Sequence, residues 1–179
     1  MYSIKILNIF MLNFRSIKIN TIYRNTYKGG TKMIDEFQGK YGFLSNFYDS
    51  EIEIEYDGLK FESVEAAYQA QKCMRRSEKE KFTKLNPSES KRLGRKVYLR
   101  PDWNKIKAGI MYELVKIKFT THEDLKEKLL ETGDQELIEG NWWHDNFFGK
   151  CTCLECKKKE QRNELGKILM KVRKEIQNN

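Results

Sequence analysis

Two stretches of the chain carry apolar residues three or four positions apart, which is the spacing of one face of an α-helix. The first predicts a helix over 104–119, and the second predicts a terminal helix from about Gln161. Such a stripe packs against other elements, so both predict core positions. The residues are Ile106, Ile110, Leu114 and Ile117 in the first helix, and Leu165, Ile168, Leu169, Val172 and Ile176 in the second.

A different pattern occurs earlier in the chain. Ile52 and Ile54 alternate with acidic residues and are followed by the dipeptide Asp57-Gly58. Alternation of this kind indicates a half-buried strand, and Asp-Gly is a strong signal for a tight hairpin turn. The sequence therefore predicts two short antiparallel strands around this turn.

Capping signals predict the remaining helices. Ser63 is an N-cap candidate for a helix over 64–74, and Asn86, directly before a proline, precedes a helix over 88–97. The segment 122–133 reads as another helix, stopped by its final glycine. Together these elements predict an α+β fold that is predominantly helical, with a small antiparallel sheet or hairpin, in a single domain.

The first 32 residues differ from the rest. They contain no Asp or Glu and consist largely of Ile, Asn, Lys, Tyr and Phe. Polar residues interrupt the apolar stretch and no small-residue cleavage site follows, which fits neither a signal nor a transit peptide. Lys28-Gly29-Gly30 can be encoded as a ribosome-binding sequence just before Met33. We therefore expect residues 1–32 to be a non-native or disordered extension, with the domain spanning 33–179.

Leaving out residues 1–32 changes the net charge of the protein. The whole chain has 34 basic and 26 acidic residues, a net charge of +8, and six of the basic residues lie in 1–32. Without them the balance is 28 minus 26, or +2, which does not favour nucleic-acid binding by charge alone. The lysine run 157–159 is expected to be solvated, with phosphate contact as the alternative. No apolar run reaches the roughly 20 residues needed to cross a bilayer, so we expect a cytoplasmic protein without a membrane partner.

Several polar and aromatic residues are not explained by periodicity. Glu65, Gln69 and Lys72 are spaced by four and three, so they share one face of the predicted helix. The simpler interpretation is that these residues form an exposed charged face. Apolar residues of the same helix that are able to pack, and the hairpin directly before it, argue against this interpretation. The stretch 141–156, NWWHDNFFGKCTCLEC, gathers tryptophans, an imidazole, a carboxylate and three thiols. It has the composition of a metal site, a catalytic site or an aromatic plug.

Taken in order, five motifs resemble the NADAR, or YbiA-like, domain family. They are FxGxYGFLSNFY, FxSVExAYQAxK, GRxVxLRxDW, TGxxxLxExNxWHDNFxG and NxLGxxLMxxR, which cover Phe37 to about Arg173. The resemblance implies a YbiA-like domain that hydrolyses N-glycosides. Two departures are visible: Ala66 stands where many members have His, and Phe148 where many have Trp. These departures bear on substrate fit.

The resemblance also implies roles for particular residues. The acidic catalytic position of the family falls on Glu65, and its second acid falls on Asp145. Its functional tryptophan falls on Trp103, and a further aromatic is Trp142 or Trp143. Other residues of the same motifs that we expect to bind substrate are Tyr68, Arg95, Asn46, Asn141 and Asn146.

This chemistry suits these residue types. Cleavage of a ribosyl C–N bond builds positive charge at the anomeric carbon, which carboxylates such as Glu65 and Asp145 stabilise. Flat aromatic rings stack on a base. Arg95 is able to bind a phosphate through bidentate hydrogen bonds, and a structural ion pair is an equal alternative for this residue. Lys72 offers a second route, because a desolvated lysine captures an opened sugar as a Schiff base.

The cysteines leave two interpretations open. Cys151, Cys153 and Cys156 form a C-x-C-x-x-C pattern that suits three ligands of a structural zinc ion, with Cys73 or His144 as the fourth. Only one such knuckle is present, and nothing indicates secretion, so we expect reduced thiols without metal. We likewise expect no cofactor and no metal in the reaction.

Two classes of function stand against each other. The first is an N-glycosidase that removes ADP-ribose from the guanine amino group in nucleic acid, or that cleaves early ribosylamine phosphates of riboflavin synthesis. An ADP-ribosyltransferase toxin is a possible partner of the first activity. The second class is a module that binds ADP-ribose or nucleic acid without catalysis. Glu65 and Asp145 favour the enzyme, because a pocket for anionic phosphates gains nothing from carboxylates.

Overall fold

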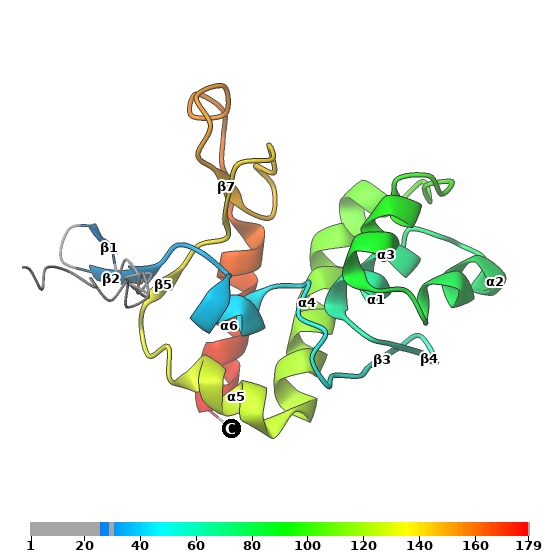
Figure 1. Cartoon of the computed structure of the whole chain (residues 1–179), viewed down its shortest axis with the longest axis horizontal. Coiled ribbons are helices and arrows are strands. Elements are labelled where there is room, and N and C mark those ends of the chain that lie inside the picture. Colours follow the sequence, from blue (N-terminus) through cyan, green and yellow to red (C-terminus); the bar gives the residue numbers. More distant parts are fainter. Residues whose placement is uncertain (1–25, 29–30, 179) are drawn as a thin grey trace, which may run out of the picture.

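The fold is described for residues 26–28 and 31–178 of a computed structural model, and it is predominantly helical with small sheets (Figure 1). This confirms the predicted fold class. In chain order the elements are β1 (Thr26–Lys28), β2 (Thr31–Ile34), the 3-10 helix η1 (Gly39–Leu44), β3 (Ile54–Tyr56), β4 (Leu59–Phe61), α1 (Val64–Ala70), α2 (Arg76–Lys79), the 3-10 helix η2 (Glu80–Phe82), α3 (Pro87–Gly94), α4 (Trp103–Thr121), α5 (Glu123–Leu130), β5 (Glu136–Leu137), β6 (Gly140–Asn141), β7 (Lys150–Cys151) and α6 (Glu164–Gln177).

The long helix α4 forms the centre of the molecule. It lies between α6 on one side and the α1–α3 group on the other (Figure 1). Leu114 and Phe119 of α4 and Leu165, Leu169 and Val172 of α6 are fully buried. Both predicted stripes therefore face the core, although Ile106, Ile117 and Ile176 are only partly buried and pack against it.

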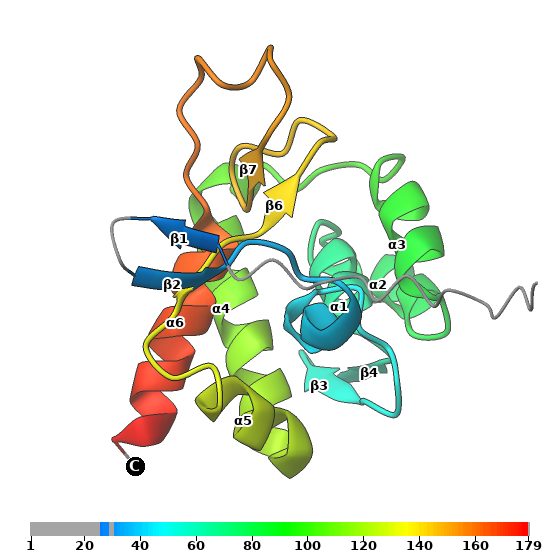
Figure 2. The same ribbon diagram turned by 60° about the vertical axis from the view of Figure 1, so that its left-hand side comes forward.

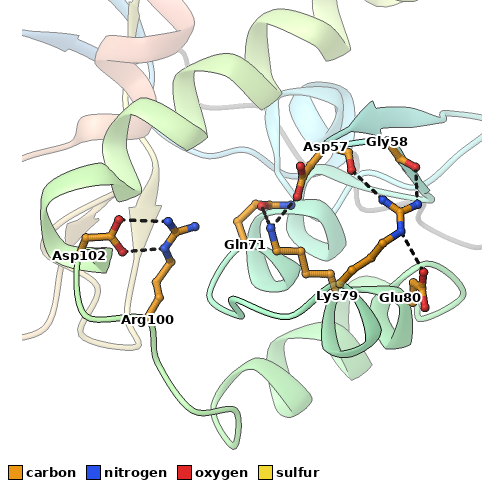
Figure 3. A network of polar contacts seen from close by, with 8 residues as sticks. Asp57, Gly58, Gln71, Lys79, Glu80, Arg100 and Asp102 are labelled. Carbon is orange, nitrogen blue, oxygen red and sulfur yellow. Dashed lines mark hydrogen bonds and ion pairs between the residues drawn. The ribbon is translucent and has the colours of Figure 1, made fainter.

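The predicted hairpin is present as β3 and β4. Its strands are antiparallel, with Tyr56 opposite Leu59, and both turn residues have positive φ, 55° at Asp57 and 68° at Gly58. Two basic side chains of α2 hold this turn. Lys79 donates to the Asp57 carboxylate and to Gln71 Oε1, and Arg76 donates to the Gly58 carbonyl (Figure 3). The hairpin is thus fixed against the segment that follows α1.

The other two sheets were not predicted. Strand β2 pairs antiparallel with β1 and parallel with β5, and β6 pairs parallel with β7. Figure 2 shows β6 and β7 side by side at the base of two long loops. A Cβ on Gly140 would lie 2.2 Å from the Asp35 carbonyl oxygen, so glycine permits the close approach of β6 to the chain after β2. Strands of two residues leave no periodic signal in a sequence.

Several helix boundaries differ from the prediction. Helix α5 ends at Leu130 rather than at 133, and α6 begins at Glu164 rather than at about Gln161. Helix α1 ends at Ala70 rather than near 74, because the amides of Lys72 and Cys73 bond three residues back, to the carbonyls of Gln69 and Ala70. The Lys72 carbonyl then accepts from Arg100 N. Helix α3 ends at Gly94, and Trp103 is the first residue of α4 rather than part of the loop before it. None of the described helices is long and apolar enough to cross a membrane.

The predicted boundary at Met33 stays a prediction. Residues 1–25 and 29–30 of the N-terminal extension lie outside the described part of the chain. Within it, Thr26–Lys28 and Thr31–Ile34 form the β1–β2 pair.

Candidate active site

A cavity of about 480 Å³ lies where the first half of the chain meets the β6–β7 loops. Its walls come from the segment between β2 and η1, the loop that follows η1, the helices α1, α3 and α4, and residues 139–148. This volume falls within the range of small-molecule sites. The residues that line it include the predicted Asn46, Glu65, Tyr68, Arg95, Trp143 and Asp145, together with Phe37, Gln38, Ser45, Phe47, Gln69, Lys91, Met111, Glu139, Gly140 and Phe148.

Glu65 enters the cavity from the first turn of α1. Ser63 caps this helix by accepting a hydrogen bond from Ala66 N at 3.0 Å, as predicted. The Glu65 side chain is buried and accepts a hydrogen bond of 2.8 Å from Gln69 Nε2. Burial raises the pKa of Glu65, and Lys91 and Lys72 oppose this rise only in part. A buried carboxyl with a raised pKa is suited to hold a proton near neutral pH.

Asp145 approaches the same cavity from the loop between β6 and β7. Its Oδ1 atom accepts hydrogen bonds from the backbone amides of Phe147 and Phe148, both at 2.9 Å. Asn141 fixes the loop from the other side, because its Nδ2 donates to the Asp145 carbonyl and its Oδ1 accepts from Asp145 N. The two predicted acids therefore share one cavity although they lie 80 positions apart in the sequence.

A third acid, Glu139, lines the cavity and was not among the predicted site residues. Its Oε2 atom is buried and has no hydrogen-bond partner within the described residues. Burial, reinforced by the negative charges of Asp145 and Glu65, raises the pKa of Glu139 to about 8. The one sequence signal that could have identified Glu139 as a site residue was its place in the TGxxxLxExNxWHDNFxG motif. The residues around it do not predict its burial, because the neighbouring strand is only two residues long.

Aromatic rings form one wall of the cavity and pack behind it. Tyr68 and Phe148 line it, with their ring centroids 5.5 Å apart in an edge-to-face contact. Trp103 packs on Tyr68 at 4.9 Å and is buried, but it is not among the lining residues. Phe148 thus occupies a wall position, which makes the departure from tryptophan relevant to the shape of the site.

The rim of the cavity combines positive charge with exposed rings. The Lys91 ammonium lies 5.0 Å from the centroid of Phe47 and 5.7 Å from that of Trp143. Arg95, at the end of α3, lines the same rim and is exposed. At the entrance, an anionic ligand would therefore meet a cation, and an aromatic ligand would meet two flat rings.

Besides Trp103, four of the predicted residues do not line this cavity. Trp142 and Asn141 border a second hollow beside β2 and β5. Asn146 borders neither hollow. Lys72 donates from Nζ to the Gly94 carbonyl at 3.2 Å, and burial lowers its pKa. Of these four, Asn141 still acts on the site through its hydrogen bonds to the Asp145 main chain, and the positive charge of Lys72 still acts on Glu65.

The three cysteines of the C-x-C-x-x-C pattern lie together with His144 in the loops beyond β6 and β7, outside the cavity lining. Cys73 is buried elsewhere and is not part of this group.

Comparison with known proteins bears on the function of this cavity. The family model of the NADAR domain matches residues 34–177. An N-glycosidase of Nostoc punctiforme is 40% identical over 144 residues, which cover 77% of this chain and 87% of that protein. A riboflavin biosynthesis protein of Vibrio vulnificus is 36% identical over 144 residues, 76% of this chain but only 36% of that longer protein.

A solved structure is also similar. The NMR structure of YbiA from Escherichia coli superposes with a TM-score of 0.69 at 28% sequence identity, covering 82% of this chain and 86% of that one. The curated sequence of this relative is named an N-glycosidase and matches 76% of this chain. The chain belongs to the NADAR domain family and is an enzyme of the N-glycosidase class, a hydrolase of N-glycosyl compounds.

Proposed function

We propose that the cavity hydrolyses the bond between the anomeric carbon of a ribosyl group and an amine, with Glu65 and Asp145 on opposite sides of the sugar. The observation that carries this proposal is the convergence of these two acids, from distant segments, on one cavity. The raised pKa of Glu65 suits it to donate a proton to the leaving amine. Asp145, held by two backbone amides, suits stabilisation of the positive charge or activation of the attacking water.

Two substrate classes agree with the rim of the cavity. Lys91 and Arg95 are placed to meet a phosphate, and Phe47 and Trp143 offer faces to a base or a ribosylamine ring. These features support ribosylamine phosphates of the riboflavin route and ADP-ribose on the guanine amino group alike. The riboflavin-related names of some relatives favour testing the first class first.

The two alternatives to this mechanism receive less support. A Schiff base on Lys72 requires its amine to reach the sugar, but this amine donates to the Gly94 carbonyl and is not part of the cavity lining. A binding module without catalysis would place three carboxylates, Glu65, Glu139 and Asp145, in a pocket for anionic phosphates. Acidic groups add nothing to the binding of an anion, so their convergence on one cavity favours a reaction over binding alone.

The proposal is tested by incubating the protein with both substrate classes and measuring the released ribose phosphate or ADP-ribose. In the active assay, we expect Glu65→Gln to lower kcat by at least about a hundredfold, the lower end of the contribution of one acid–base group. Asp145→Asn keeps an oxygen for the two amides but loses the charge, so it should lower kcat far more than substrate affinity.

Glu62→Gln is the matched control, because Glu62 is exposed and lies three residues from Glu65. It should leave kcat unchanged. Near-normal turnover by both Glu65→Gln and Asp145→Asn, in folded protein, would contradict the two-carboxylate mechanism.

A further inference from the structure

The loops beyond β6 and β7 bring together four side chains that do not take part in the proposed reaction. They are His144, Cys151, Cys153 and Cys156. One ligand atom from each lies within 4.8 Å of all the others. His144 Nδ1 lies 3.3 Å from Cys153 Sγ and 3.3 Å from Cys156 Sγ. Two of the four, Cys151 and Cys156, are buried.

We propose that these four residues bind one structural zinc ion through three thiolates and the Nδ1 atom of His144. Zinc in structural sites takes four sulfur or nitrogen ligands in a tetrahedron, at about 2.3 Å for sulfur and about 2.0–2.1 Å for nitrogen. A tetrahedron of these dimensions separates neighbouring ligand atoms by about 3.4–3.8 Å. The observed group is close to this size, so it needs only small side-chain adjustments to enclose the ion.

The ligands come from two separate limbs of the chain, as structural zinc sites require. His144 lies in the loop that leaves β6, and Cys151 is the last residue of β7. The pairing of Asn141 with Cys151 holds the two limbs in register. Only one cysteine knuckle is visible in the sequence, and the fold supplies the missing fourth ligand from the other limb.

The backbone around the thiols is arranged as in a metal knuckle. Cys156 N lies 3.4 Å from Cys153 Sγ and donates to it, and amide donors of this kind stabilise a thiolate. Gln161 Nε2 donates to the carbonyls of Cys151 and Cys156, at 2.8 and 3.1 Å, and so closes the loop behind the ligands. These contacts fix the ligands before a metal arrives.

Two further features fit this role. His144 has φ of 67°, a left-handed conformation that a side chain other than glycine adopts only when its surroundings require it. Three thiolates and a neutral imidazole around Zn²⁺ leave a net charge of about −1. The exposed Lys157 and Lys158 directly follow the last ligand and bring positive charge to this end of the loop, while Lys159 is paired with Glu155.

The site would fix the loop that carries Asp145 without taking part in the chemistry. Asp145 directly follows His144, and its main chain is bound to Asn141 at the end of β6. A tetrahedral ion with four protein ligands has no open position for water or substrate, which makes it structural rather than catalytic.

Zinc content and a cobalt spectrum test the proposal on the full chain. We expect protein that has been desalted after exposure to zinc to hold about one ion per chain. The cobalt-loaded protein should show the visible bands of tetrahedral Co²⁺ together with thiolate-to-metal charge transfer. Cys153→Ser and His144→Gln should each lose the bound zinc or hold it much more weakly.

Cys73→Ala is the matched control, because it removes a thiol outside the group. It should keep the full zinc content. Folded wild-type protein that retains no zinc and gives no cobalt–thiolate bands would overturn the site, even if the variants fail to fold. Loss of zinc in Cys73→Ala with full retention in His144→Gln would overturn the assignment of His144.

Discussion

At the scale of single residues, Glu139 is unusual because burial raises its pKa well above the ordinary value of a glutamate. Its pKa rises from 4.5 to about 8 in the folded protein. Between these two values the folded state binds one more proton than the unfolded state. The contribution of Glu139 to stability is therefore fully present below pH 4.5 and is lost as the pH rises through about 8.

Glu139→Gln tests this directly, since glutamine mimics the protonated form. We expect the free energy of unfolding of the variant, relative to the wild type, to increase as the pH rises from 4.5 to 8, by at most about 1.4 kcal/mol per pH unit. Denaturant unfolding at several pH values measures it. A difference that stays constant over this range would show that Glu139 titrates as an ordinary glutamate.

At the scale of elements, the contact between α1 and α3 depends on Gly94. A Cβ at this position would lie 1.9 Å from Gln69 Oε1 and 3.1 Å from Gln69 Cβ. Gln69 is buried and donates to Glu65, so it is not free to move aside without breaking that hydrogen bond. Gly94→Ala should therefore lower stability by about 1–3 kcal/mol and also reduce turnover.

Gly109→Ala provides the control within a helix. Gly109 is exposed in the middle of α4, and a Cβ there would meet no atom within 4 Å. Because alanine is the better helix former, this change should raise stability by about 0.5–1 kcal/mol and leave turnover unchanged. Thermal unfolding of both variants decides the comparison, and equal effects would mean that the α1–α3 contact tolerates a side chain.

At the scale of the whole molecule, β2 is the first of the described strands that reaches the core. Its parallel pairing with β5 joins Met33 to Glu136 and Ile34 to Leu137, whereas β1 pairs, within the described part of the chain, with β2 alone. We therefore expect a chain that starts at Met33 to fold and turn over like the full chain. Melting temperature and kcat of the two proteins make the comparison, and loss of solubility or activity in the shorter one would show that the preceding residues belong to the domain.

Part of the site could be predicted, because its residues belong to motifs with recognisable capping residues and helical spacing. Glu65 follows a good N-cap on a short helix, and its bond to Gln69 follows from a spacing of four. The separation of Trp143, at the cavity, from Trp142, outside it, could not be predicted, because the residues are neighbours in an irregular loop. The raised pKa of Glu139 depends on its burial and on the nearby charges of Asp145 and Glu65, which no local pattern encodes.

The sequence by itself determined the helical core and the hairpin turn, because apolar periodicity, capping residues and positive-φ turns act over a few neighbouring positions. The two acids were predicted from the resemblance of their motifs to the NADAR family. Only the tertiary structure decided which distant segments meet. It placed Glu139 beside the other two acids and brought His144 to the three cysteines. The reason is that β2, β5, β6 and β7 are two to four residues long and pair across the chain, so their partners are selected by the packing of the whole domain.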